Sequence, residues 1–354
     1  MNSYEKVLVV IFALILMGEF NVVLQSRVVV QTKIQITNTR YPDETRVEIT
    51  YNVKQGSYPN ILKVALIPVS QPLDDKNLYV YYDTNYPSSF ISYKSMMGII
   101  DHLQENQRLK GYLGKLEIVD ASRLKEVMTH EYDSILIIPS GVLPDTVHTK
   151  ENSLVKQYLE NGGTLVWIGD VFAFFSGKYR EKLTWPSPEN PGLEAQEKIL
   201  GYIVSNVSNF ESADIETKYS DALSLKYSGI RSGIYVEEVL KHNGLVLGKV
   251  KENRTTIGMV PVGKGSLILF GGKVTPTRTL FGEDFVASDI VNILLSGIIH
   301  STRQIAYQTI QREDAYNQKL EITINDHNIS GFVFLAVSDD YYSYFFFRQF
   351  IPKS

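Results

Sequence analysis

The chain has 354 residues, of which 44% are hydrophobic and 21% charged, a balance typical of a folded protein with room for about two domains. Its formal net charge is −4 and its lysines and arginines are scattered, which argues against a surface built for nucleic acid. The absence of cysteine excludes disulfides, thiolate metal sites and a cysteine nucleophile.

The chain begins with an apolar segment. Residues 7–17 form an unbroken hydrophobic run behind Lys6, and apolar character resumes through residue 24. The whole run is long enough to span a bilayer with some strain, whereas its first part alone matches the core of a signal peptide. We predict that residues 1–26 form an N-terminal hydrophobic helix that anchors the chain in the cell membrane. A cleaved signal peptide and the buried start of a soluble fold are the alternatives.

With an anchor or a signal peptide, the main domain lies outside the cytoplasm. Glu19, near the far end of the segment, either snorkels to the membrane interface or contacts a partner helix. Three N-glycosylation sequons, at Asn206, Asn253 and Asn328, agree with this location. The signal is weak, because such triplets arise by chance in a chain of this length.

Two segments after the anchor alternate apolar and polar residues. Residues 28–39 and 45–53 each place an apolar residue at every second core position, and Tyr41-Pro42-Asp43 separates them. This pattern predicts a β-hairpin with one buried face within residues 27–62.

An alternating series of strands and helices follows. Residues 62–69 form a continuous apolar run, typical of a parallel strand buried on both faces, and residues 70–89 read as a polar loop. The other predicted elements are helices at 93–108, 122–128 and 149–161 and strands at 115–119, 134–139 and 164–168. The short connections predict an α/β fold with a doubly wound, flavodoxin-like parallel sheet.

The remaining elements close this region and return to β structure. They are a hairpin at 245–250 and 255–261, a strand at 263–272, a helix at 284–299, and strands at 304–311, 319–325, 331–338 and 341–350. The final strands and the first hairpin share a half-buried pattern. We therefore expect residues 27–62 and 301–354 to form one antiparallel β domain, with the α/β domain, residues 63–300, inserted between them.

The motifs of the α/β domain follow a distinctive order. LKVALIPV is followed by SILIIPSG, by a helix that ends at Gly162-Gly163, by TLVWIGD, and by VGKGSLILFGG before the last helix. In this order, over roughly residues 63–300, the chain resembles the class I glutamine amidotransferase-like superfamily, and in particular its non-enzymatic branches.

The resemblance points to specific residues. In the enzymes of that superfamily a cysteine follows the strand that matches residues 164–168, and a histidine follows the strand that matches residues 266–271. Here Asp170 falls at the first position, and residues 273–277 contain no histidine. Ser140-Gly141 matches the loop whose backbone amides stabilise an oxyanion. Because nucleophile and base are both missing, the resemblance implies a domain that is not an enzyme and needs no cofactor.

Open α/β sheets bind ligands beyond the carboxyl ends of their strands. This edge is predicted to carry a candidate ligand cleft made of Ser70, Ser140, Gly141, Asp170 and Thr275. Asp170 either binds a ligand hydroxyl or acts as a base, or it caps the following helix, which is the interpretation that its residue type favours. The spacing of histidines and acidic residues supports no metal site.

The last predicted strand is aromatic on both faces. Tyr342, Tyr344 and Phe346 share one face, and the alternate positions are also largely aromatic. A core strand explains this pattern. The alternative is a face that docks on a protein partner or rests at the membrane interface, and with Glu19 these residues form the candidate interface.

Three functional hypotheses remain. The first is an extracytoplasmic, membrane-anchored, non-catalytic subunit that binds or stabilises a membrane protein complex. The alternative is a surface protein that binds carbohydrate or another small ligand in the strand-end cleft. The tyrosines that would stack on sugar rings are Tyr79, Tyr81, Tyr82 and Tyr86. The third is a hydrolase that uses Asp170 with Ser140.

Overall fold

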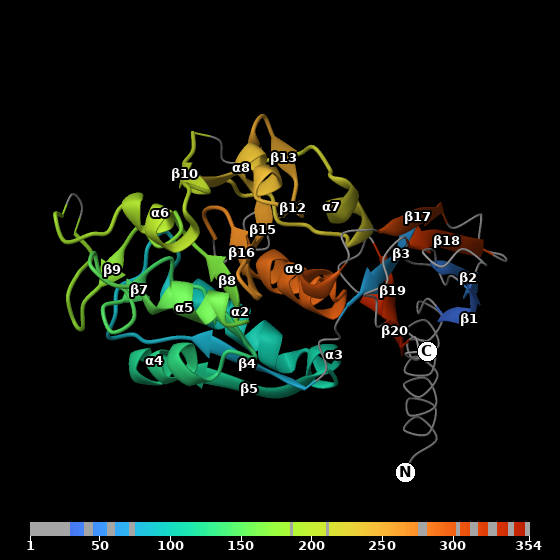
Figure 1. Ribbon diagram of the computed structural model, residues 1–354, viewed down its shortest axis with the longest axis horizontal. Coiled ribbons are helices and arrows are strands. Elements are labelled where there is room, and N and C mark those ends of the chain that lie inside the picture. Colours follow the sequence, from blue (N-terminus) through green and yellow to red (C-terminus); the bar gives the residue numbers. More distant parts are fainter. Residues whose placement is uncertain are drawn as a thin grey trace, which may run out of the picture. The chain divides into compact units, whose positions relative to one another are not determined.

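The computed structural model describes residues 29–38, 45–54, 61–70, 75–184, 187–209, 212–274, 282–301, 305–311, 318–324, 331–338 and 343–350. The chain divides into two compact units, Met1–Ser70 with Gln304–Ser354, and Gln71–Arg303. Each unit has its own sheets (Figure 1). The predicted anchor, residues 1–26, lies outside the described residues.

The first unit contains two antiparallel sheets. One has the order β1 (Val29–Asn38), β2 (Thr45–Lys54), β18 (Gln318–Ile324). The other has the order β17 (Ala306–Gln311), β3 (Ile61–Val69), β19 (Gly331–Ser338), β20 (Ser343–Phe350). Asn38 pairs with Thr45, which confirms the predicted hairpin. Strands from both ends of the chain pair with each other in both sheets.

The prediction that residues 62–69 are a parallel strand is wrong. β3 pairs antiparallel with β17 on one side and with β19 on the other. Its side chains from Val64 to Val69 are all buried, and those of β19 from Gly331 to Val337 are buried too. A central antiparallel strand that is covered on both faces has the same continuous apolar sequence as a buried parallel strand, so the pattern alone does not give the strand direction.

The second unit is an α/β fold around a seven-stranded sheet. Its order is β12 (Leu245–Val246), β15 (Ile257–Val262), β16 (Gly265–Phe270), β8 (Thr164–Ile168), β6 (Ser134–Ile138), β4 (Lys76–Tyr81), β5 (Leu113–Val119). The five strands from β16 to β5 are parallel, and β15 and β12 extend the sheet antiparallel. Numbered along the chain, the parallel strands lie in the order 2-1-3-4-5.

The first parallel strand is therefore β4, which lies in the segment that we predicted to be a polar loop. Its tyrosines and the lysine at its first position make this segment look polar in the sequence. In the structure, Leu78, Tyr79, Val80 and Tyr81 are buried. Lys76 is also buried, and its ammonium group bonds Asp133 at 2.6 Å, which compensates the charge.

Helices cover this sheet. They are α2 (Tyr93–Glu105), α3 (Gln107–Lys110), α4 (Ala121–His130), α5 (Leu154–Glu160), α6 (Glu194–Leu200), α7 (Lys218–Ala222), α8 (Val236–Lys241) and α9 (Glu283–Leu295). The first turns of α2, α4 and α5 are capped by Ser92, Asp120 and Ser153. The cap at Ser153 explains why α5 begins later than residue 149.

Alternate side chains of the parallel strands build two cores. One set, including Tyr79, Leu136 and Trp167, packs with residues of α4, α5, α6 and α8. The other set points to the opposite face by the two-residue repeat of a strand. Helices α2 and α9 contribute nothing to the first core and pack against each other, which places them on that opposite face (Figure 1).

The second unit also contains two smaller sheets. β10 (Ser205–Val207), β11 (Ser232–Tyr235), β14 (Arg254–Thr255) and β13 (Val250–Lys251) form an antiparallel sheet. β7 (Leu143–Pro144) and β9 (Ser176–Gly177) form a parallel pair in the loops that follow β6 and β8. The predicted hairpin at 245–261 is present: β12 pairs antiparallel with β15, and β13 with β14.

Candidate functional site

The carboxyl ends of β6 and β8 bring together three of the predicted cleft residues, Ser140, Gly141 and Asp170. Ser70 is not among them: it follows the antiparallel strand β3 of the first unit and is exposed. Thr275 lies outside the described residues. The part of the predicted cleft that the structure brings together is made of the loops after β6 and β8. The loop after β4, which the prediction did not include, lies beside them.

Asp170 is the centre of this arrangement and is only 3% exposed. Its Oδ2 accepts a hydrogen bond from the Ser89 hydroxyl at 2.5 Å. Its Oδ1 accepts one from the Val171 amide at 2.6 Å and one from the Ser232 hydroxyl at 2.9 Å. Trp167 also donates its indole N–H to the Asp170 carbonyl at 2.7 Å. We call Ser89, Asp170 and Ser232 the strand-end lock, because one carboxylate ties three separate segments together.

The sequence did not point to Ser89 or Ser232. They lie 81 and 62 residues from Asp170, so no spacing within a helix or strand links them. Ser89 lies in the loop after β4, and recognising β4 would have placed this loop at the carboxyl edge of the sheet. Ser232 begins β11 in the antiparallel side sheet, and no local signal relates it to this edge.

Glycines allow the backbones of these loops to touch. Gly141 has φ +66° and Gly169 has φ +120°, conformations that L residues rarely adopt. A Cβ on Gly141 would lie 2.6 Å from the Ser89 carbonyl oxygen, and one on Gly169 would lie 3.0 Å from the Gly141 Cα. The Ser89 amide also donates to the Ser140 carbonyl at 2.8 Å. The loop that would stabilise an oxyanion is thus packed against protein backbone.

The prediction that Asp170 caps a helix is wrong in detail. Residues 171–174 form a turn, in which Ala173 has φ +53°, and no helix starts there. The capping hydrogen bond to Val171 exists, but it serves a turn. Burial raises the pKa of the Asp170 carboxyl above its ordinary value, while the hydrogen bonds from Ser89, Val171 and Ser232 act in the opposite direction.

A cation and an aromatic ring lie beside the lock. The Arg231 guanidinium lies 4.1 Å from the centre of the Phe90 ring, a cation–π distance. Phe90 has φ +58° and is 43% exposed, an unusual conformation for a bulky residue. The positive charge of Arg231 lowers the pKa of Asp170, so it partly offsets the effect of burial.

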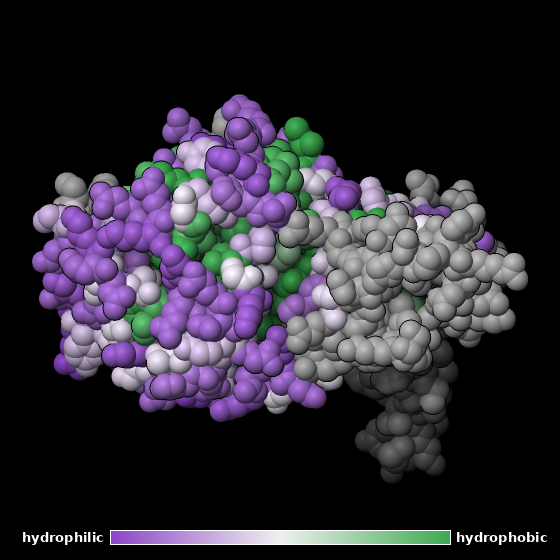
Figure 2. All heavy atoms as spheres, in the orientation of Figure 1, coloured by the Kyte–Doolittle hydropathy of each residue, from purple (hydrophilic) through white to green (hydrophobic). Residues whose placement is uncertain are grey.

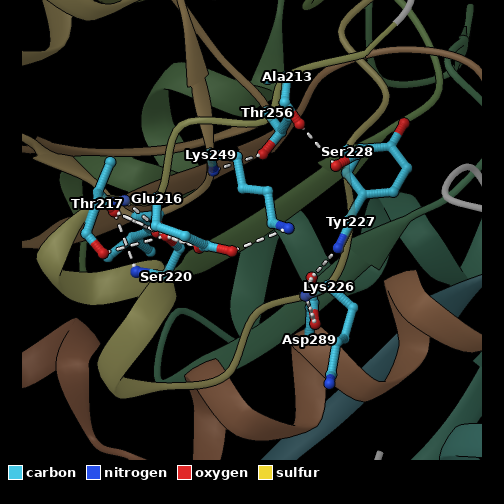
Figure 3. Close-up of polar contacts among 11 residues, drawn as sticks. Ala213, Glu216, Thr217, Ser220, Lys226, Tyr227, Ser228, Lys249, Thr256 and Asp289 are labelled. Atoms are coloured by element: carbon cyan, nitrogen blue, oxygen red, sulfur yellow. Dashed lines mark hydrogen bonds and ion pairs between the residues drawn. The ribbon is translucent and has the colours of Figure 1, made fainter. Parts of the chain in front are cut away.

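A second buried carboxylate holds the segment that leads to Ser232 (Figure 3). Asp289 of α9 accepts hydrogen bonds from the backbone amides of Lys226 and Tyr227 at 2.9 to 3.0 Å. The Tyr227 hydroxyl donates to the Gly271 carbonyl at the end of β16 at 2.6 Å. Burial raises the pKa of Asp289 to about 7, although the two amides favour its ionised form.

A lysine–glutamate pair borders the same segment. Lys249 and Glu216 form an ion pair at 2.9 Å, and Ser220 donates its hydroxyl to Glu216 at 2.7 Å (Figure 3). Ser228 donates its hydroxyl to the Ala213 carbonyl at 2.7 Å. The contacts of Asp289 and Ser228 fix residues 226–228 within the unit.

The geometry does not assemble the hydrolase that we considered. Ser140 donates its hydroxyl to the Val142 carbonyl at 2.6 Å rather than to Asp170. His148 bonds the Ala173 carbonyl at 2.9 Å, and burial lowers its pKa to about 4. The hydroxyls that do reach Asp170 belong to Ser89 and Ser232, both at most 5% exposed. A nucleophile needs an activating base and access to substrate, and these side chains lack the access.

The tyrosines proposed to stack on sugars are not available for that role. Tyr79 and Tyr81 lie inside β4 and are buried, and Tyr86 is buried with its hydroxyl 3.3 Å from Asp145. Tyr82 is half-buried and packs edge-on against Tyr93. Three of these four rings are therefore buried away from a ligand, and Tyr82 offers only a partly covered ring.

The remaining predicted residues lie on the periphery or outside the described residues. Asn253 is exposed at the β13–β14 turn, and Asn206 is half-buried in β10. Glu19, Asn328 and Tyr342 lie outside the described residues, and β20 includes positions 344 and 346. Within the described part of the chain, no helix has the length and apolar character needed to cross a membrane. Nor do the described side chains include a group of three or more potential metal ligands.

Comparison with known proteins gives a partial match. The MJECL34 family matches residues 76–207, which begin at β4 and include Ser89 and Asp170. The uncharacterized protein MJECL34 of Methanocaldococcus jannaschii is 31% identical over 110 residues. This alignment covers 28% of the present chain and 34% of that protein, so the chain spans about a third of its relative's length.

Similarity to solved structures is low. Cytoplasmic protein STM1381 from Salmonella typhimurium LT2 has a TM-score of 0.35 and 12% identity, and the match covers 64% of this chain and 98% of that one. A β-galactosidase from Bacillus circulans sp. alkalophilus has a TM-score of 0.36 and 12% identity, with 70% and 41% covered. Similarity at this level supports no statement about function.

Proposed function

We propose that this chain is a non-catalytic, extracytoplasmic subunit, held at the cell membrane by its N-terminal segment, that binds or stabilises a membrane protein complex. The observation that carries the proposal is the strand-end lock. The resemblance assigns Asp170 to the position of the enzymes' nucleophile, and both of its carboxyl oxygens accept hydrogen bonds from within the chain. A buried, fully bonded carboxylate supports a structural role at the position where an enzyme would perform its reaction.

The proposal includes the kind of domain. We regard the second unit as a doubly wound, flavodoxin-like domain of the class I glutamine amidotransferase-like type. The 2-1-3-4-5 order of its parallel strands supports this assignment, because flavodoxin-like sheets have that order. The packing of α4 and α5 on one face and of α2 and α9 on the other supports it as well.

The terminal β unit offers a surface for the partner. β20, which includes two candidate interface positions, ends the four-stranded sheet and has β19 as its paired neighbour among the described strands. A strand at a sheet edge presents backbone groups that another chain can pair with. This edge supports a protein partner, in line with the aromatic composition of the strand.

The absence of cysteine allows a direct test of location. Lys125→Cys places a single thiol on the exposed side of α4, without a background from other cysteines. We expect a membrane-impermeant maleimide to label this variant in intact cells, and we expect the protein to sediment with membranes. Deleting residues 1–26 should remove the labelled surface protein from the membrane fraction. Labelling only after permeabilisation would refute the extracytoplasmic location, and membrane retention of the deletion variant would refute the anchor.

A further inference from the structure

A cavity of about 540 Å³ has a lining that includes none of the three residues of the strand-end lock. Its walls are the segment after β7, at residues 145–151, and residues 176–184 and 187–190, with Pro87 beside them. The volume is within the range of small-molecule sites in proteins. Figure 2 shows that this end of the second unit, around β7, β9 and α6, has a mainly hydrophilic surface.

Hydrogen bonds define the walls of the cavity. The Asp145 amide donates to the Gly177 carbonyl at 2.8 Å beside the β7–β9 pair. Lys178 forms an ion pair with Glu189, which joins two parts of the second wall. Lys150 donates from its ammonium group to the Pro188 carbonyl at 3.3 Å, which links the two walls. The cavity is therefore bounded by segments that are bonded to each other.

The lining is polar and nearly balanced in charge. It includes carboxylates at 145, 151, 181 and 189 and ammonium groups at 150, 178 and 182, together with several hydroxyls and one amide. An apolar ligand would remove exposed charged groups, such as those of Glu151, Glu181 and Lys182, from water at a cost in free energy. A strongly charged ligand of either sign would meet like charges. A neutral ligand that donates and accepts many hydrogen bonds is the best match.

Apolar surface accompanies these polar groups. Pro87, Leu183 and Pro188 also line the cavity. Apolar side chains beside polar groups suit ligands that have both C–H faces and hydroxyls.

We infer that this cavity binds a short neutral oligosaccharide. Sugars combine hydroxyls that donate and accept with apolar ring faces, and this combination is what the lining offers. The inference does not depend on the proposed role in a membrane complex, because it concerns only the lining of this cavity. It moves the carbohydrate site from the four tyrosines considered above to the walls at residues 145–151, 176–184 and 187–190.

Titration calorimetry on the full chain, in a detergent without a sugar head group, tests this inference. The probes are maltotriose, cellotriose, mannotriose and chitotriose, with inorganic phosphate and glucuronate as charged comparisons. We expect at least one trisaccharide to bind and neither anion to compete. Failure of all four trisaccharides to bind, or a preference for the anions, would overturn the inference.

Matched variants locate the site. Asp145→Asn keeps an acceptor for Tyr86 but removes a lining charge, and Lys182→Ala removes an exposed lining side chain. Each should weaken trisaccharide binding at least tenfold. Asp101→Asn on α2 and Lys125→Ala on α4 change the same residue types at exposed positions elsewhere and should bind as wild type. Equal binding by all four variants would overturn the site, and Lys182→Ala keeps the test valid if Asp145→Asn does not fold.

Discussion

Replacing Asp170 with alanine is expected to lower the free energy of unfolding by about 3 to 5 kcal/mol, because three buried donors lose their acceptor and each orphaned group costs about 1 to 3 kcal/mol. The donors are the Ser89 and Ser232 hydroxyls and the Val171 amide. Because the two serine hydroxyls can rotate toward other acceptors, we expect the total loss of stability to stay below the maximum sum of these three costs. Asp170→Asn retains one acceptor oxygen and should cost about 1 to 2 kcal/mol.

Tryptophan fluorescence follows the unfolding of this region, because Trp167 is fully buried and its indole donates to the backbone carbonyl of residue 170. Urea unfolding followed by tryptophan emission would measure the free energy of both variants in the same detergent. A loss of less than about 0.5 kcal/mol for Asp170→Ala would contradict a structural role for the carboxylate and would return Asp170 to the candidates for ligand binding.

Two glycines provide a control for the same lock. Gly141 and Gly192 both have φ +66°, but only at Gly141 would a Cβ meet backbone, 2.6 Å from the Ser89 carbonyl oxygen. Gly192→Ala should therefore show only the cost of the left-handed conformation, about 1 kcal/mol. Gly141→Ala should cost about 2 kcal/mol more, since the Ser89 loop must shift. Equal losses would show that the loops have room to move apart.

Replacing Asp289 with asparagine is expected to change how stability depends on pH. Burial raises the pKa of Asp289 from an ordinary value near 3.8 to about 7. The folded state then binds this proton more tightly than the unfolded state does. The stability that this group contributes is complete below pH 4 and is lost as pH rises through 7.

Asparagine carries no titrating proton at this position, so the variant should not lose this stability as pH rises through 7. Near pH 5 we expect Asp289→Asn to be less stable than wild type by about 1 to 2 kcal/mol, because its amide group faces the donors of Lys226 and Tyr227. Between pH 5 and pH 8 the free energy of unfolding of the variant should rise, relative to that of wild type, by on the order of 2 to 4 kcal/mol.

Thermal unfolding of both proteins at several pH values measures the difference. The nearby cations Lys226 and Lys249 lower the pKa of Asp289 and are the same in both proteins, so the comparison isolates the carboxyl. Asp101→Asn, at an exposed position of α2, should follow the wild-type curve. A constant gap between wild type and Asp289→Asn from pH 4 to 8 would refute the raised pKa.

Much of the α/β unit could be predicted from the sequence. Continuous apolar runs that end in glycine or proline identify β6 and β8 as buried strands, and the loops that follow such parallel strands must converge at one edge. That reasoning places Ser140, Gly141 and Asp170 together, and the structure agrees. Gly162-Gly163 likewise separates α5 from β8 as the pattern predicts.

The first parallel strand was predicted at β3, but it is β4, and this error shows the limit of such reasoning. Hydrophobicity reports that a strand is covered on both faces, and it does not report whether the neighbours run parallel or antiparallel. β3 is the more apolar strand, whereas β4 carries two tyrosines and Lys76, whose charge is compensated by Asp133. The partner that makes a buried lysine acceptable is 57 residues away, so no local pattern identifies it.

The lock and the cavity were beyond prediction for a related reason. Asp170 meets Ser89 and Ser232 only because the loops after β4 and β8 and the start of β11 are brought together by the fold. The cavity depends on residues 176–184 and 187–190, where the sequence predicts no helix or strand. Contacts between irregular segments follow from tertiary packing, and they have no period that a sequence can display.

The central claim, a non-catalytic subunit of a membrane complex, is tested most directly by isolating the tagged full chain from its own membranes in mild detergent and measuring the stoichiometry of the proteins recovered with it. We predict recovery of a membrane protein in fixed ratio to the chain, with the same ratio for wild type and for Asp170→Asn, because the lock is structural. Recovery of the chain alone, in detergent that leaves other membrane complexes intact, would contradict the claim.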